Sequence, residues 1–220
     1  MNENWPEAID RRSLTGEQPM KPSRWPRTER RQARIRSVLA RRQPDLTVVL
    51  ENIHDQHNVS AILRSCDAVG ILDVHAVYTE ESPPVHSFAR ETSASAAKWV
   101  DVTFYPSIPA CFEHLRGAGY KIVGTALGGD ARPLFGCDFR PPTAIVLGNE
   151  MRGISDDARR LADGLIAIPM AGMVQSLNVS VAAAVCLYEA FRQRLEHGSY
   201  ARPRLQATEL ARLEEDWLKR

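Results

Sequence analysis

The sequence lacks the residue patterns of metal-binding and disulfide-stabilised proteins. It has only four cysteines in 220 residues, and they are scattered without a C-x-x-C pair. Zinc needs clustered ligands, and a disulfide framework is typical of short, cysteine-rich secreted chains. The six histidines show no metal-type spacing either. We therefore expect buried, reduced thiols and no bound metal.

Long apolar runs and several common catalytic motifs are also missing. The longest strongly apolar stretch, residues 179–188, contains Ser180 and is far shorter than the roughly 20 residues of a membrane span. The N-terminus is polar and has no apolar segment typical of a secretion signal. No P-loop, Gly-x-Gly-x-x-Gly or Gly-x-Ser-x-Gly sequence occurs. These absences predict a cytoplasmic protein with no membrane partner, and they give no support to nucleophilic hydrolysis.

Positive charge is concentrated in one short segment, although the whole chain carries a net charge of only +1. Residues 21–42 hold nine lysines and arginines against Glu29 alone. Within this segment Arg27, Arg30, Arg31 and Arg34 have helical spacing. Such a basic arm is typical of contact with a polyanion, most simply nucleic acid, and a solvated helix face is the other interpretation.

Strand and helix patterns alternate after Pro44. Strands are predicted at 46–50, 74–78, 99–104, 121–126, 144–147 and 165–168. Helices are predicted at 28–43, from about 59 to a cap at Gly70, at 108–117, from about 176 to 195, and from about 208. This alternation predicts an α/β domain with a mostly parallel sheet.

The same patterns divide the chain into four parts. Residues 1–27 form a flexible leader, and 28–43 the basic N-terminal helix. Residues 44–195 form the α/β domain, and 196–220 a C-terminal helical extension. At 220 residues the chain is long enough for one domain of ordinary size with such appendages.

Polar residues gather in three segments that follow predicted strands, where an α/β sheet binds its ligands. In the first, Asn58 stands where a helix N-cap belongs. Arg64 lies further along the same helix, and it is either an edge residue with its charge in solvent or a cation directed into a site. Both interpretations of Arg64 remain open from the residues alone.

The second and third segments contain glycine and polar side chains together. Gly148-Asn149-Glu150-x-x-Gly153 places two flexible turns around a carboxylate, which either brings backbone close to a ligand or forms an ordinary turn. Ser176 is an N-cap candidate for the last long helix. Asn178 then falls in the first turn, where a modest helix former has no obvious structural reason to be.

Together, the three segments resemble the SpoU/TrmH family of SPOUT RNA methyltransferases. The matching motifs are Asn58-x-x-Ala61-x-x-Arg64 with Ala68-x-Gly70, then Leu147-Gly148-Asn149-Glu150-x-x-Gly153, then Ile168-Pro-Met-x-Gly172 with Ser176-Leu-Asn178-Val-Ser180. Three ordered motifs are far more specific than any one alone. The similarity extends over roughly residues 28–220, and segments 34–39, 42–54 and 93–99 resemble the subgroup that modifies tRNA.

The resemblance implies a fold and a reaction. The fold is a mostly parallel α/β sheet with helices on both faces, whose C-terminal segment passes through a deep trefoil knot, although most folds avoid knots. The implied cofactor is S-adenosylmethionine, bound in the knot of a homodimer. The implied reaction is methylation of a ribose 2′-hydroxyl in tRNA, at guanosine 18 of the D-loop.

The resemblance also implies roles for particular residues. Arg64 is the implied catalytic residue, supported by Asn58, Glu150, Ser176 and Asn178. The implied cofactor-binding residues are Thr125, Ala126, Leu127, Gly148, Asn149, Gly153, Ile168, Met170, Ser176, Leu177 and Asn178. For tRNA we expect contacts from Arg27, Arg30, Arg31, Arg34, His57, Lys98, Arg202 and Arg204.

Arg64 is an awkward general base because a guanidinium stays protonated in proteins. Our hypothesis is that Arg64 binds a neighbouring phosphate and lowers the cost of forming an alkoxide. Three rival functions remain: the same chemistry on ribosomal RNA or another tRNA position, a non-catalytic RNA-binding protein, and a small-molecule enzyme. The basic arm argues against the last of these.

Overall fold

A computed structural model describes residues 27–84 and 96–220, with the side chains of Arg27 and Thr28 left out. Its centre is a seven-stranded sheet in the order β3-β2-β1-β6-β4-β7-β5, in which every neighbouring pair is parallel. The strands are β1 (Leu46–Glu51), β2 (Asp73–Val77), β3 (Asp101–Tyr105), β4 (Lys121–Thr125), β5 (Arg132–Pro133), β6 (Thr143–Leu147) and β7 (Gly164–Ala167). The predicted parallel α/β sheet is confirmed.

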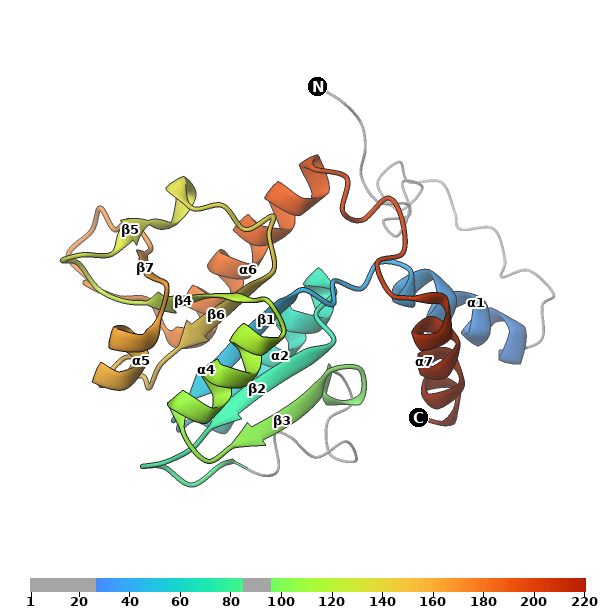
Figure 1. Ribbon diagram of the computed structural model, residues 1–220, viewed down its shortest axis with the longest axis horizontal. Helices are drawn as coiled ribbons and strands as arrows, with labels where there is room; N and C mark the ends of the chain where they lie inside the picture. Colours follow the sequence, from blue (N-terminus) through green and yellow to red (C-terminus); the bar gives the residue numbers. More distant parts are fainter. Residues whose placement is uncertain (1–26, 85–95) are drawn as a thin grey trace.

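In the described part of the chain, six α-helices and two short 3₁₀ turns lie against the sheet or beside it (Figure 1). They are α1 (Arg27–Leu39), α2 (Gln56–Val69), η2 (Ala96–Lys98), α4 (Ile108–Gly117), η3 (Leu134–Gly136), α5 (Asp156–Leu161), α6 (Val179–Glu196) and α7 (Ala207–Lys219). The sequence patterns missed α5, which has six mostly polar residues and buries only Ala158. They also missed β5, which has two residues and includes a proline. Neither element is long enough to display a hydrophobic period.

The sheet is covered on both faces, and β1 shows how one strand supplies both cores. All six of its residues are buried, as its unbroken apolar run predicts for a central parallel strand. Val48 and Leu50 point into a core that α2 and α6 cover. Val49 points the other way, into a second core under α4 and α5. Residues at the strand ends are therefore held by strands that are packed into a hydrophobic core on each face of the sheet.

The two terminal helices, α1 and α7, pack against one another beside the sheet (Figure 1). Leu39 and Trp217 belong to the small apolar cluster between these two helices. The ring centroid of Trp217 lies 4.9 Å from that of Trp99. The described arginines of the basic arm are not all available to a ligand. Arg42 is 1% exposed and forms an ion pair of 2.5 Å with Asp67, so its charge is internal.

The end of α6 is fastened to the start of β1 by the fully buried Arg194. Its guanidinium donates to the Asp45 carboxylate at 2.5 Å and to the backbone carbonyls of Phe139 and Pro141. Burying a charge is costly unless it is paired and hydrogen-bonded, and Arg194 meets both conditions. The contact ties the C-terminal part of the domain to its first strand.

Membrane and metal features are absent from the part of the chain that the structure describes. No helix there combines the length and apolar character that crossing a membrane would need. The same residues contain no group of three or more His, Cys, Asp or Glu side chains that could hold a metal ion. The predicted four-part division of the chain stays a prediction, and residues 1–26 of its leader lie outside the described residues.

Candidate active site

A pocket of about 450 Å³ opens where β4, β6 and β7 end. The second and third motif segments form much of its wall together with the segment after β4. Every residue that the resemblance implied for the cofactor lines it: Thr125, Ala126, Leu127, Gly148, Asn149, Gly153, Ile168, Met170, Ser176, Leu177 and Asn178. The parallel strands thus bring together residues that lie up to 53 positions apart in the sequence.

Gly148 is required by the loop's own backbone. A Cβ at this position would collide with the carbonyl group of Gly153, which turns back onto Gly148. The loop closes through the Gly153 amide, which donates to the Asn149 carbonyl at 2.8 Å, and Gly153 itself has φ +72°. The two glycines therefore let the loop fold tightly upon itself beside the pocket.

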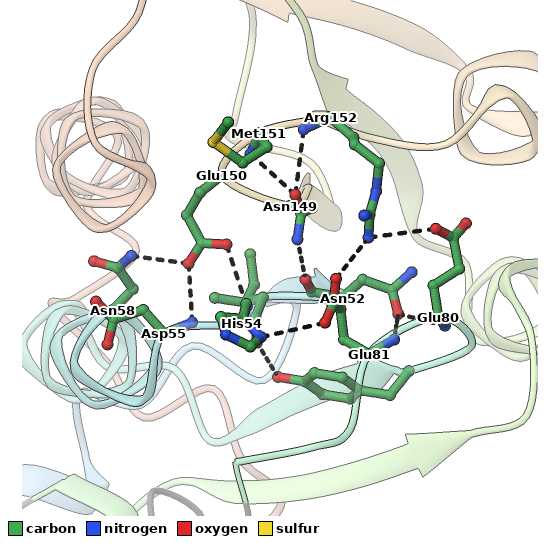
Figure 2. Close-up of polar contacts among 12 residues, drawn as sticks. Asn52, His54, Asp55, Asn58, Glu80, Glu81, Asn149, Glu150, Met151 and Arg152 are labelled. Atoms are coloured by element: carbon green, nitrogen blue, oxygen red, sulfur yellow. Dashed lines mark hydrogen bonds and ion pairs between the residues drawn. The ribbon is translucent and has the colours of Figure 1, made fainter.

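Glu150 is the centre of a polar network that joins the first two motif segments (Figure 2). Its carboxylate accepts from Asn58 Nδ2 at 2.9 Å and from the amides of His54 and Asp55 at 3.2 Å each. Partial burial alone would raise the pKa of the Glu150 carboxyl. The hydrogen bonds outweigh burial and lower that pKa below its usual value, so the group is ionised at neutral pH.

The predicted N-cap at Asn58 is wrong. Asp55 caps α2 by accepting from the His57 amide at 2.8 Å, and Asn58 lies one turn inside, 7% exposed. Because Asn58 is free of capping, its side chain can bridge two partners. Its Nδ2 donates to Glu150, and its Oδ1 accepts from Asn178 Nδ2 at 3.1 Å.

The predicted N-cap at Ser176 is also wrong, and the correction accounts for Asn178. Asn178 is the N-cap of α6, and its Oδ1 accepts from the Ser180 amide at 2.9 Å and hydroxyl at 2.6 Å. Ser176 is exposed in the preceding segment and lines the pocket. One asparagine therefore caps a helix with its oxygen and reaches Asn58 with its nitrogen.

Arg64 stands apart from this network. It is exposed on α2, it does not line the pocket, and it forms no hydrogen bond or ion pair with another residue in the described ranges. Of the two interpretations left open, the folded chain places its charge at the surface. The structure therefore brings together Asn58, Glu150, Ser176 and Asn178 but leaves Arg64 outside.

The predicted RNA contacts occupy different environments. Arg30, Arg31 and Arg34 on α1, His57 on α2 and Arg202 before α7 are exposed, and Lys98 is half-buried. Arg204 is held in an ion pair with Asp45 at 2.7 Å. The side chain of Arg27 lies outside the described part of the chain.

Several residues beside the network were not anticipated. Glu51, 2% exposed, ends β1 and accepts from the Ser155 amide at 2.9 Å, while burial raises the pKa of its carboxyl. Asn52 follows it in a left-handed conformation. Arg152 of the second motif reaches Glu81 after β2 at 2.9 Å. A signal was present, since Glu51-Asn52 directly follows the strand predicted at 46–50 and so falls at the ligand-binding edge of the sheet.

Comparison with known proteins identifies the family. A family model described as the SpoU rRNA Methylase family matches residues 45–188. The chain belongs to this family. Residues carrying all three motifs of the SpoU family lie within the matched range, and so do the strands β4, β6 and β7, whose ends form the pocket.

Individual members of the SpoU family are similar over most of the chain. It is 52% identical over 194 residues to the tRNA (guanosine(18)-2'-O)-methyltransferase of Thermus thermophilus, covering 88% of this chain and 98% of that one. Its structure matches the A. aeolicus TrmH/SpoU tRNA modifying enzyme with a TM-score of 0.79 at 37% identity, covering 87% and 96% of the two chains. The SpoU methyltransferase AviRb from Streptomyces viridochromogenes, in complex with AdoMet, matches with a TM-score of 0.60 at 32% identity, covering 70% and 59%.

Proposed function

We propose that this SpoU-family protein uses S-adenosylmethionine to methylate the ribose 2′-hydroxyl of guanosine 18 in tRNA. The observation that carries the proposal is the single pocket on which the second and third motif segments converge beside the Glu150 network. The name of the Thermus thermophilus relative supports the same substrate, since the similarity spans most of both chains. Because the substrate is tRNA, we place the activity in the cytoplasm.

The chemistry of the pocket suits S-adenosylmethionine. Leu127, Ile166 and Ile168 give apolar wall for an adenine ring, while the strand ends around them offer backbone donors and acceptors. The charged residues that line the pocket are Glu150, Arg152 and Arg159, which suits a ligand bearing both a carboxylate and cationic groups. When bound, the cofactor supplies a methyl group on a sulfonium that a ribose oxygen can attack.

The protein's own residues position the reaction and stabilise charge. Asn178, Asn58 and Glu150 form a fixed line of hydrogen bonds from α6 through α2 to the second motif loop. Such preorganised groups lose no free energy to reorganisation when the hydroxyl reacts. Arg64, exposed and unpaired among the described residues, is free to bind the phosphate next to the target ribose and to stabilise the developing alkoxide.

The second part of the proposal is that arginines on α1 bind tRNA by contacting its phosphates. Arg30, Arg31 and Arg34 are exposed on a helix that α7 holds in place. Such contacts add affinity without reading sequence, and binding weakens as salt rises. We therefore expect tRNA affinity to fall steeply between low and moderate salt, whereas affinity that is flat with salt would refute these contacts.

We also propose that the protein works as a homodimer, in which the exposed faces of α2 and α6 meet a second copy. These helices pack against one another. On α6, Val181 and Tyr188 are about half-exposed, two turns apart, opposite the buried face. On α2, Ala61, Arg64 and Ala68 lie on the side away from the core. A dimer through this face would bring Arg64 near an active site. The trefoil knot that the resemblance implies is a separate prediction, and it also stays a prediction.

One experiment tests the activity directly. The protein is incubated with labelled S-adenosylmethionine and unmodified tRNA, and the methylated ribose is mapped. Label at the 2′-oxygen of guanosine 18 supports the proposal, and label at another position or only on ribosomal RNA contradicts the substrate. Binding of tRNA without transfer would favour the non-catalytic RNA-binding function instead.

A further inference from the structure

Asn52 is the one residue other than glycine with a positive φ, +52°, among the described residues. It is 4% exposed and lies directly after β1. A left-handed conformation costs free energy for most side chains, and asparagine is among the few that tolerate it. The strain persists because the surroundings hold it in place, which is common beside functional sites.

The side chain of Asn52 organises the segment that follows β2 (Figure 2). Its Oδ1 accepts from three consecutive amides, those of Thr79, Glu80 and Glu81, at 2.9, 3.1 and 3.4 Å. Its Nδ2 donates to the Thr79 hydroxyl at 3.3 Å. The single side-chain oxygen of Asn52 thus fixes the backbone of residues 79–81.

The same residue reaches the second motif loop by two routes. Directly, its backbone carbonyl accepts from Asn149 Nδ2 at 2.8 Å. Indirectly, the turn that it fixes carries Glu81, whose carboxylate pairs with Arg152 at 2.9 Å. The Asn149 side chain in turn accepts from the amides of Met151 and Arg152, at 3.0 and 3.2 Å. Asn52 therefore holds the loop on both sides of Glu150.

A third link runs along the chain itself. The amides of His54 and Asp55, two and three residues after Asn52, donate to the Glu150 carboxylate. The left-handed turn sets the direction in which the chain leaves β1 before these amides. The position of the loop that carries Glu150 and the position of the amides that donate to its carboxylate consequently both depend on Asn52.

We infer that Asn52 is a positioning residue for methyl transfer, which acts by fixing Glu150 and, through it, Asn58. The inference rests on the proposed function for its catalytic consequence, but its structural part stands without it. Misplacement of catalytic groups by about 1 Å can lower a rate by roughly 100-fold. Loss of the Asn52 side chain should therefore lower kcat. It should leave KM for tRNA almost unchanged, because the arginines proposed to bind tRNA phosphates lie on α1, and no residue of this network lies on that helix.

The decisive variant is Asn52→Gly. Glycine adopts φ +52° without strain, so the turn is kept while the side-chain hydrogen bonds are lost. Hydrogen exchange at the amides of residues 79–81, which donate to the Asn52 side chain, should become faster, and kcat should fall by roughly 10- to 100-fold. Asn52→Asp keeps the accepting oxygen, so it should restore protection and most of kcat. Thr79→Val is the matched control, since it removes only the acceptor for Nδ2 and should behave like the wild type.

The outcomes separate cleanly. Wild-type exchange at these amides in Asn52→Gly would overturn the inference, and so would an Asn52→Asp variant as impaired as the glycine variant. A fall in kcat matched by an equal fall in folded fraction would also overturn it, because the role would then be one of stability alone. If the wild type fails to methylate tRNA, the proposed function is wrong, and the exchange pattern still decides the role of Asn52.

Discussion

Lowering the pH should destabilise the folded protein through one buried histidine. His75 lies on β2, 6% exposed, with its Nδ1 3.1 Å from the Tyr105 hydroxyl and its ring centroid 5.9 Å from that of His114. Burial, reinforced by the charge that His114 can carry, lowers the pKa of His75 from 6.5 to about 4. The ring is therefore neutral in the folded protein at pH 7.

The sign of the effect follows from which state binds the proton. Between pH 6.5 and 4 the unfolded chain protonates this histidine and the folded protein does not, so the free energy of unfolding falls as the pH falls. Each unit of pKa difference corresponds to about 1.4 kcal/mol. The full difference therefore amounts to about 3 kcal/mol, which is present well above pH 6.5 and is lost progressively as the pH falls through 6.5 to below 4.

Urea unfolding followed by circular dichroism at pH 7, 6, 5 and 4.5 would measure this effect. The wild type should lose about 2–3 kcal/mol more over that range than His75→Phe, which has no titrating ring. Burial raises the pKa of Glu51 and Asp73, and these groups act in the opposite direction, but they are common to both proteins and cancel. His57→Phe removes an exposed histidine and serves as the control. Equal losses in the wild type and His75→Phe would refute the reasoning.

Three further substitutions, the last with a matched control, test other parts of the structure. Gly148→Ala should displace the second motif loop, cost about 1–3 kcal/mol and weaken S-adenosylmethionine binding in calorimetry, and unchanged affinity would contradict the backbone collision. Arg64→Lys keeps the charge but loses the planar fork, so kcat should fall at least roughly tenfold while cofactor affinity is kept, and a lysine variant that retains most activity would contradict bidentate phosphate binding. Arg194→Met should lower the free energy of unfolding by about 3–5 kcal/mol in urea. Arg192→Met on the exposed side of α6 should cost less than about 1 kcal/mol, and similar costs at the two positions would contradict the role of the buried pair.

The fold was predictable where the chain repeats a simple pattern. The apolar run of β1 and the Gly70 cap of α2 are visible in the sequence, and both appear as expected, with Gly70 at φ +90°. Charge patterns were less informative. Arg42 reads as part of the basic arm, but its burial depends on Asp67 and on Trp217, which lies 175 residues away in the sequence. No local period encodes such a partner.

The location of the site was predictable, whereas its connections were not. Polar loops after buried strands mark the ligand edge of a parallel sheet, and the pocket lies there. The cap assignments failed because several residues in a row could cap each helix. Asp55 and Asn58 compete at α2, as Ser176 and Asn178 compete at α6. The tertiary contacts of Asn58 with Glu150 and Asn178, which no local pattern encodes, explain why an amide at position 58 is used for joining and not for capping.

Amide side chains are suited to this joining role for a physical reason. An asparagine both donates and accepts, so Asn58 can satisfy the Glu150 carboxylate on one side and the Asn178 amide on the other. A carboxylate in its place would repel Glu150, and an ammonium would leave the Asn178 donor without an acceptor. The hydrogen-bonded series Asn178–Asn58–Glu150 therefore contains one ionised group, and each donor in it faces an acceptor. Because the three residues come from α2, the loop after β6 and the start of α6, this match exists only when the strands are assembled in their parallel order.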